Sequence, residues 1–365
     1  TVVRHGARGH LMISWGRGYM VVIRILLVIL LACSAAWAAP SITDATGTFT
    51  SGQTITITGV DFGSKTTAAP LVWDTIEDGA ADTTATTGTW SSVYTGAGLG
   101  SIVANTDQKH SGTYSARGDP SDGYARFMKT LGEQSGGARL YGYMWRMRTE
   151  ALAGTVVNQK LWRLYPDSNK PNTVISTSTN NGVVVCEDCG GTGATIRPYL
   201  LEDQWQLEEV EFQLSSAIDQ ADGVVNYYID GVQRVNYTSL MSRCTGGDLP
   251  ITQFVFDNQG GLTGYIYMDD LYLDTTWARV MLGDQPTLAA STHREIQPCA
   301  TWTEGTPDTI TITFNPGSFS SGTAYLFVVD EDGNVSSGYE VTIGAGSSPS
   351  TPTITSGGIH GGGIR

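Results

Sequence analysis

The clearest alternation of hydrophobic and polar positions lies at residues 54–58, where three threonines alternate with Ile55 and Ile57. Successive side chains of a strand point to opposite faces, so this run predicts a strand with one buried and one solvated face that ends at Gly59. A single strand cannot bury its apolar face by itself. Residues 69–80 do not continue the alternation, so the partners of this strand must lie elsewhere in the chain.

Strand-like segments recur through the middle of the chain, separated by turns rich in Gly, Asp and Asn. We predict strands at residues 71–76, 93–95, 113–117, 124–130, 138–148, 156–165, 173–177, 182–186, 205–214, 223–236, 251–257 and 264–274. A short helix is predicted at Thr238–Arg243. Many short strands between turns favour an all-β fold, with a two-sheet jelly roll over residues 70–276.

A second alternating region covers residues 278–344, where Asp332-Gly333 marks a hairpin turn. Together with residues 39–66 it resembles an IPT/TIG immunoglobulin-like domain. The resemblance rests on Gly59, Phe62 and Gly63 in the first part and on Trp302, Ile310, Ile312, Tyr325, Phe327, Val329, Gly333 and Ser336 in the second. It implies a discontinuous sandwich with the jelly roll inserted, because the ends of compact domains often lie close together. The alternative is an N-terminal arm followed by a separate C-terminal sandwich.

The inserted segment carries "LVWDTIEDG", "KHSGTYSAR", "QKLWRLY", "EDQWQLEEVEFQLS" and "GYIYMDDLYLD". These stretches resemble strands and turns of the concanavalin A-like lectin/glucanase superfamily. The E-x-D-x-x-E strand of the glucanases is absent, so the segment is more similar to the lectin-like and polysaccharide-lyase-like members. The resemblance implies a jelly roll that binds a polysaccharide.

A targeting signal is predicted near the start of the chain. Arg24 supplies a positive flank, Ile25 to Ala32 form an apolar core, and Ala36-Trp37-Ala38 provides a cleavage site. We expect residues 1–38 to comprise an upstream segment, an initiator at Met20 and a bacterial-type signal peptide, and the product to be secreted or on the cell surface. The apolar run is too short to span a bilayer. The alternative is a lipoprotein anchored at Cys33.

Removal of this leader changes the charge and the cysteine count. The leader holds four arginines and no acid, so 17 of the 21 basic residues remain against 35 acidic ones, a net charge of −18. Such a surface disfavours nucleic acid and anionic membranes as partners. Cys186, Cys189, Cys244 and Cys299 remain, and an exported chain favours a local Cys186–Cys189 disulfide. A redox pair would require a helix N-terminus, and a zinc site a second C-x-x-C. Residues 345–365, rich in Gly, Ser and Pro, predict a flexible tail.

Candidate ligand-binding residues lie on three of the predicted strands. If Trp145 and Trp162 face the core, the arginines that follow them project outward onto one sheet surface. The candidates are Arg146, Arg148, Arg163, Tyr165 and Glu209. Aromatic rings stack on the C–H faces of sugars, and arginine forks match carboxylates, so a uronate-containing glycan is the expected ligand. The alternative is a purely structural role, in which the aromatic residues fill the core and the charged residues pair on an outer sheet face.

The candidate chemistry leaves three functions open. The first is a secreted carbohydrate-recognition protein. The second is a polysaccharide lyase with Tyr165, Arg163 and Glu209 as catalytic candidates, or less favoured a hydrolase that uses Glu209 and Glu211. The third is a structural or adhesive surface module. No G-x-S-x-G, H-E-x-x-H or P-loop motif is present. His110 is expected to be structural and His293 to lie on the surface.

A calcium site is a further expectation. Asp269 and Asp270 on the last jelly-roll strand could face Glu77 and Asp78 near the first one, and carboxylate oxygens are the ligands that Ca²⁺ prefers. The alternative is that these acids keep an edge strand soluble.

Overall fold

The computed structural model describes residues 38–78, 90–95, 103–118, 125–149, 160–166, 173–177, 183–187, 192–196, 201–245, 250–259 and 264–344. Ala39–Arg365 cluster into one compact unit. Its described residues form antiparallel strands and a 3-10 turn, η3 (Leu288–Ala290). In this part of the chain no helix combines the length and apolarity needed to cross a membrane. The predicted signal peptide and C-terminal tail lie outside the described residues. The predicted all-β fold class is confirmed.

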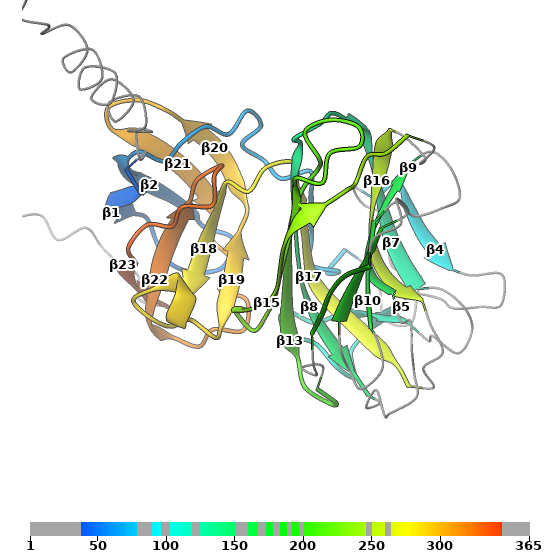
Figure 1. Cartoon of the computed structure of the whole chain (residues 1–365). Helices are drawn as coiled ribbons and strands as arrows, with labels where there is room; N and C mark the ends of the chain where they lie inside the picture. The colour runs from blue at the N-terminus through cyan, green and yellow to red at the C-terminus, as the bar shows by residue number, and fades with distance from the viewer. Residues whose placement is uncertain are drawn as a thin grey trace, which may run out of the picture. The chain divides into compact units, whose positions relative to one another are not determined.

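The larger sandwich is built from two sheets, as predicted for the jelly roll (Figure 1). The first sheet has the order β12 (Thr192–Ile196), β11 (Val183–Glu187), β10 (Thr173–Thr177), β9 (Lys160–Pro166), β16 (Ile251–Gln259), β7 (Ala125–Gln134) and β4 (Ser92–Thr95). The second has the order β15 (Val232–Leu240), β14 (Gly223–Ile229), β13 (Gln206–Gln213), β8 (Arg139–Arg148), β17 (Ile266–Asp274), β6 (Ser115–Gly118) and β5 (Val103–Asn105), and β3 (Val72–Asp74) also pairs with β17.

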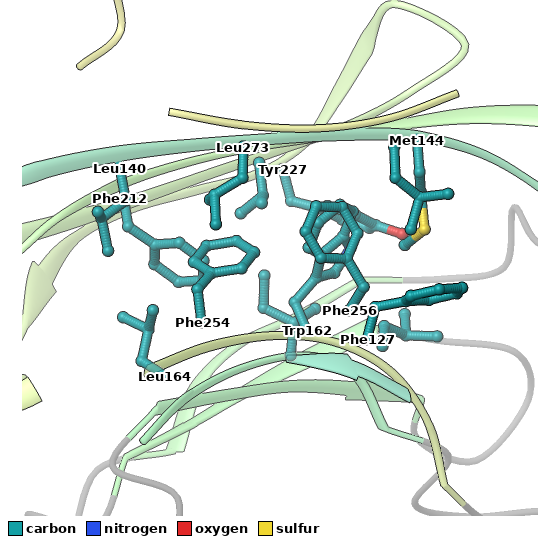
Figure 2. Close-up of a cluster of buried hydrophobic side chains, with 14 of the residues drawn as sticks. Phe127, Leu140, Met144, Trp162, Leu164, Phe212, Tyr227, Phe254, Phe256 and Leu273 are labelled. Atoms are coloured by element: carbon teal, nitrogen blue, oxygen red, sulfur yellow. The ribbon is translucent and has the colours of Figure 1, made fainter. Parts of the chain in front are cut away.

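Large aromatic and aliphatic side chains fill the space between these two sheets (Figure 2). Trp162 and Phe254 pack at 5.9 Å between ring centroids, and both approach the backbone of β8 at Gly142. A Cβ at Gly142 would lie 2.7 Å from the Trp162 ring, so only glycine fits beneath it. The described part of the jelly-roll interior is therefore closely packed at Gly142.

The smaller sandwich is formed by two segments that lie far apart in the sequence. One sheet has the order β1 (Ser41–Thr46), β2 (Thr54–Val60), β21 (Asp308–Thr313) and β20 (Cys299–Thr303); the other has β19 (Arg294–Gln297), β18 (Arg279–Gly283), β22 (Gly322–Val329) and β23 (Tyr339–Ile343). Ile57 of β2 lies opposite Ile310 of β21, and both side chains are buried. Figure 1 shows the blue N-terminal strands beside the orange C-terminal ones. The predicted discontinuous sandwich is thus confirmed.

The strand predictions hold throughout the jelly roll, with three local differences. Every segment predicted as a strand contains one, and residues 223–236 form the hairpin β14–β15 around the Asp230-Gly231 turn. The helix predicted at Thr238–Arg243 is wrong, because β15 continues to Leu240, which pairs with Gly223. The strands β5 and β12 are short and were not predicted.

The central strands of the eight-stranded sheet, β13, β8 and β17, are buried on both faces. One face lines the jelly-roll core, and the other packs against the smaller sandwich. Tyr141 and Tyr143 of β8 form this second contact with Trp277, Met281 and Phe327. This double burial decides where the candidate functional side chains lie.

Candidate functional site

A cavity of about 790 Å³, which we call the junction cleft, opens where β13–β15 meet the smaller sandwich. Strands β13 and β14 form its floor, and Arg279, the η3 turn and residues 332–337 form its opposite side. Its polar and aromatic lining includes Glu209, Glu211, Asn226, Tyr228, Gln233, Trp277, Arg279, Arg294 and Asp332. A concave site with several convergent polar groups is the usual form of a small-molecule or sugar site.

Glu211 is the centre of a hydrogen-bond network on the cleft floor. Its carboxylate accepts from Arg279 Nη2 at 3.0 Å, Asn226 Nδ2 at 3.1 Å and Tyr228 Oη at 3.3 Å. Asn226 Oδ1 in turn accepts from Gln233 Nε2 at 3.1 Å. Alternating residues of β14 share a face, which brings Asn226 and Tyr228 to the cleft together. The cleft floor is therefore a set of fixed donors and acceptors beside a phenol ring.

Glu209, a predicted ligand-binding and catalytic candidate, lies deeper in the same cleft. Its carboxylate accepts from Tyr141 Oη at 2.8 Å and from Arg294 Nη1 at 3.1 Å. Burial, followed by the charge of Glu209, raises the pKa of Tyr141 well above its ordinary value, so this phenol stays protonated and donates. Because Glu209 and Glu211 are each ion-paired with an arginine, they are arranged as acceptors and not as a proton donor and a nucleophile.

The two predicted arginines of β8 do not line this cleft. Arg146 and Arg148 are fully buried and face the jelly-roll interior, where both ion-pair with Glu208 at 3.4 and 2.9 Å. Arg146 also donates to the carbonyl of Leu161. The predicted common strip of Arg146, Arg163 and Glu209 is therefore wrong as geometry, since these residues occupy two sheets and three faces.

The error has a physical cause in the double burial of β8. Trp145, which was expected in the jelly-roll core, packs instead with the smaller sandwich. Leu140 and Met144 take the opposite face and enter the core. When both faces of a strand are buried, hydrophobic alternation no longer shows which face meets which neighbour.

Arg163 and Tyr165 come together as predicted, on a different surface. Both lie on β9 on the face of the seven-stranded sheet that points away from the core side chain Trp162. Arg163 Nη1 donates to Tyr165 Oη at 2.5 Å and also ion-pairs with Asp257 of β16. Arg126 Nε of β7 lies 3.9 Å from the same Asp257. We call these four residues the sheet-face cluster.

The predicted calcium ligands are partly assembled around the loop that contains residues 106–114. Asp269 Oδ2 accepts the backbone N–H of His110 at 2.9 Å and of Ser111 at 3.2 Å, while Glu77 Oε1 accepts the N–H of Thr113 at 2.7 Å. Asp78 is exposed and lies near Asp74 instead. Glu77 and Asp269 thus bind one loop from two sides.

Asp270 is the anomalous member of this acidic group. It has φ +50°, is fully buried, and neither carboxylate oxygen has a hydrogen-bond partner of normal geometry, although the Ser111 side chain is near enough to lower its pKa slightly. Burial, followed by the charges of Asp269 and Glu295, raises its pKa well above the ordinary value. No lysine or arginine ion-pairs with Glu77, Asp269 or Asp270 among the described residues. Carboxylate oxygens are the ligands that Ca²⁺ prefers, but among the described residues these three acids do not form a group of mutually close ligand atoms, so the Ca²⁺ site stays a prediction.

Two of the four cysteines considered above, Cys244 and Cys299, have described side chains. Cys189 and the side chain of Cys186 lie outside the described residues, so their disulfide stays a prediction. Cys244 is disulfide-bonded, whereas Cys299 is a buried free thiol, so these two do not pair. Burial raises the pKa of Cys299 to about 11, which makes it an inert core residue.

Several cleft residues were missed by sequence analysis. Asn226 and Tyr228 alternate within "GVVNYYIDG", and this period of two could have indicated a polar face. Arg279 and Arg294 belong to the smaller sandwich and reach the cleft only through the tertiary fold. No local pattern in the sequence marks them.

Comparison with known proteins gives no match to a protein-family model or to a curated protein. Among solved structures, the chain is similar to the cellulose induced protein Cip1, with TM-score 0.39, 15% identity and coverage of 56% of this chain and 97% of that one. The chain is also similar to the carbohydrate esterase vb_24B_21 from the Shiga toxin-encoding bacteriophage phi24B, with TM-score 0.36, 12% identity and coverage of 56% of this chain and 97% of that one. For the alginate lyase AlgAT5 from Polysaccharide Lyase family 7, the TM-score is 0.32, the identity is 9%, and the match covers 47% of this chain and 80% of that one. Likenesses of this size carry no information on function.

Proposed function

We propose that this chain is an exported carbohydrate-recognition protein that binds a glycan in the junction cleft. The observation that supports this most directly is the network around Glu211, in which a carboxylate, two amides, a guanidinium and a phenol are fixed by one another. Sugar hydroxyls are recognised by planar acceptors and donors of this kind, and a phenol ring beside them offers a stacking surface. The N-terminal leader predicted from the sequence supports export.

Recognition is favoured over glycoside hydrolysis by the state of the two carboxylates. A hydrolase needs one carboxyl group to donate a proton and another to act as base or nucleophile. Glu209 and Glu211 are each bound to an arginine at 3.0–3.1 Å, which favours acceptor roles for both. The cleft therefore suits binding without cleavage.

The experiment is a binding panel of neutral and acidic polysaccharides, followed by titration of the best ligand. Asn226→Ala and Tyr228→Ala should each weaken binding about 5- to 10-fold, since each removes one hydrogen-bonding group of the cleft. Tyr265→Ala is the matched control, because Tyr265 is 43% exposed and does not line the cleft. The proposal is overturned if the cleft variants bind the glycan as tightly as the unmodified chain does. It is also overturned if no polysaccharide of the panel binds and the chain binds a cell-surface protein instead.

The sheet-face cluster supports a second candidate, a polysaccharide lyase. Its specific observation is the contact of Arg163 with Tyr165 Oη. Arg163 would bind the uronate carboxylate, and Tyr165 as phenolate would take the proton on the carbon next to it. The C–O bond to the neighbouring sugar then breaks, Tyr165 returns the proton to the leaving oxygen, and an unsaturated chain end remains.

This second candidate is tested by ultraviolet absorbance of unsaturated ends after incubation with uronate polysaccharides. Tyr165→Phe should abolish their release and leave binding intact. Arg163→Ala should weaken binding of acidic glycans by one to two orders of magnitude, as expected for the loss of a charged hydrogen bond of about 1.5–3 kcal/mol. Absence of unsaturated ends with every uronate polymer would exclude the lyase and leave recognition.

A further inference from the structure

Two histidines far apart in the sequence direct the same ring nitrogen at one carboxylate oxygen. His110 Nε2 lies 2.7 Å and His293 Nε2 lies 2.9 Å from Glu295 Oε1. The two nitrogens and the carboxylate oxygen all lie within 4.8 Å of one another. His110 comes from the jelly-roll loop before β6, whereas His293 immediately precedes β19 of the smaller sandwich and Glu295 lies within it.

Stacking holds both imidazoles in place. The His110 ring lies 3.7 Å from the Trp145 ring at an interplanar angle of 13°, and the His293 ring lies 3.9 Å from Phe319 at 8°. The His110 backbone N–H also donates to Asp269. Because the rings are fixed, their nitrogens converge without help from a bound ligand, as in a preorganised metal site.

Glu295 is fully buried and held from its other side. Its Oε2 accepts from Trp145 Nε1 at 3.2 Å and lies 3.0 Å from Tyr143 Oη, so Oε1 is the oxygen left for the imidazoles. The backbone N–H of Ser318 also donates to Oε1 at 3.2 Å. The carboxylate is therefore held in one orientation, although no lysine or arginine ion-pairs with it in the part of the chain that the structure describes.

A catalytic triad does not account for this arrangement. Ser318 Oγ lies 3.1 Å from His293 Nε2, but the carboxylate contacts that same nitrogen. A serine–histidine–acid triad requires the serine and the acid to bind opposite ring nitrogens. Two imidazole nitrogens and one carboxylate oxygen are instead the ligand set of many zinc sites and of non-haem iron sites.

We propose that His110 Nε2, His293 Nε2 and Glu295 Oε1 bind a divalent transition-metal ion. Ligands at 2.0–2.1 Å from a tetrahedral ion lie about 3.3 Å apart, so the observed separations of 2.7 and 2.9 Å would widen by a few tenths of an ångström on binding. The side chain of His293 is 28% exposed, which gives an ion access from solvent, and Ser318 Oγ or water would take the remaining position. The bound ion would join the jelly-roll loop to β19, and this inference is independent of the glycan proposal.

The experiment uses the full chain, stripped with a chelator and titrated calorimetrically with Zn²⁺, with visible absorption of bound Co²⁺ as a second measurement. We expect saturable one-to-one binding. His110→Ala and His293→Ala should each weaken it at least about tenfold and reduce the Co²⁺ bands. The control, Glu340→Gln, changes an exposed carboxylate on β23 that is not a member of this group, and it should bind Zn²⁺ as the unmodified chain does.

Glu295→Gln is a poorer test, because Glu295 accepts five hydrogen bonds and its loss also weakens the fold. The His293 variant avoids this difficulty, because its side chain is 28% exposed, whereas that of His110 is only 6% exposed. The proposal is overturned if the stripped chain shows no one-to-one binding of Zn²⁺ or Co²⁺. It is also overturned if both histidine variants fold and bind the ion with unchanged affinity.

Discussion

Glu208 illustrates at the residue scale how charges are stabilised inside the jelly roll. It is fully buried, ion-pairs with Arg146 and Arg148, and accepts from Trp162 Nε1 at 3.2 Å. Burial alone would raise its pKa, but the charges of the two arginines outweigh burial and lower it below the ordinary value of 4.5. Removing one partner of such a group leaves the others uncompensated in the interior.

We therefore expect Glu208→Gln to lower the free energy of unfolding by about 3–5 kcal/mol at pH 7. Because the folded pKa of Glu208 lies below the unfolded one, its contribution is complete above about pH 4.5 and is lost as the pH falls through the folded value. Urea unfolding at several pH values measures this. The difference between the two proteins should shrink below pH 4.5.

The matched control is Glu133→Gln, an exposed carboxylate on β7, which should change stability by less than about 0.5 kcal/mol. A Glu208→Gln protein as stable as the control at pH 7 would show that the buried arginines are compensated in another way.

Single residues also mark what the sequence could and could not show. Arg163 and Tyr165 were expected to lie side by side, because alternation on one strand places them on one face, and they do. His293 was expected on the surface, yet it meets His110 across 183 positions of sequence. Such a meeting depends on how two sandwiches join, and no periodicity in either segment encodes it.

At the scale of elements, the strands were predictable and their orientation was not. Period-two alternation located β2 and β14 because each alternates between fully and partly buried positions. Strand β8 is buried along nearly its whole length on both faces, so its pattern fitted two orientations equally well. The position of Arg146 followed from the wrong choice between them.

Strand β2 should be essential to the smaller sandwich, because it joins β1 to six strands that come from residues 279–343. Ile57 is fully buried opposite Ile310, and its truncation leaves a cavity. We expect Ile57→Ala to destabilise the protein by about 2–5 kcal/mol and to accelerate amide hydrogen exchange in β21 and β20. The amides of β9 and β16 in the jelly roll provide the internal reference.

Exchange that is faster in the jelly roll but unchanged in β21 would contradict this expectation. Thr56→Ala is the matched substitution on the same strand, at a position that is only half buried, and should have a much smaller effect.

The loop at residues 106–114 and strand β17 should respond to Ca²⁺ as a unit. The unpartnered carboxylate of Asp270 and the oxygens of Asp269 and Glu77 would gain a compensating charge. An ion present at about 100 times its dissociation constant adds about 2.7 kcal/mol, so we expect 10 mM CaCl₂ to raise Tm by about 5 °C or more if the dissociation constant is about 0.1 mM.

Mg²⁺ at the same concentration should have a smaller effect, and Asp269→Asn should remove the response to Ca²⁺. Glu340→Gln, an exposed carboxylate on β23, is the control. If Tm does not change with Ca²⁺, these acids bind no Ca²⁺ under these conditions, and their burial destabilises the fold without compensation by this ion. The response to Zn²⁺ should be lost in His293→Ala while the response to Ca²⁺ is kept, which distinguishes the two proposed metal sites experimentally.

At the scale of the whole molecule, the smaller sandwich helps to build the site. It covers one face of the eight-stranded sheet and contributes Arg279 and Arg294, which bind the two cleft glutamates. The resemblance found in the sequence indicated a discontinuous sandwich, but it gave no reason to expect a shared cleft. The residues that complete the cleft could be recognised only once the two sandwiches were seen in contact.

The discontinuity of the smaller sandwich also sets an order of events during synthesis. Val60, at the end of β2, and Asp308, at the start of β21, are 248 positions apart, which a ribosome covers in roughly 12–50 s. Throughout that interval the nascent β1–β2 hairpin has no partner for Ile55 and Ile57, while the jelly roll emerges and can fold. The threonines that alternate with these isoleucines keep one face of the hairpin wettable, which limits association with other nascent chains during the wait.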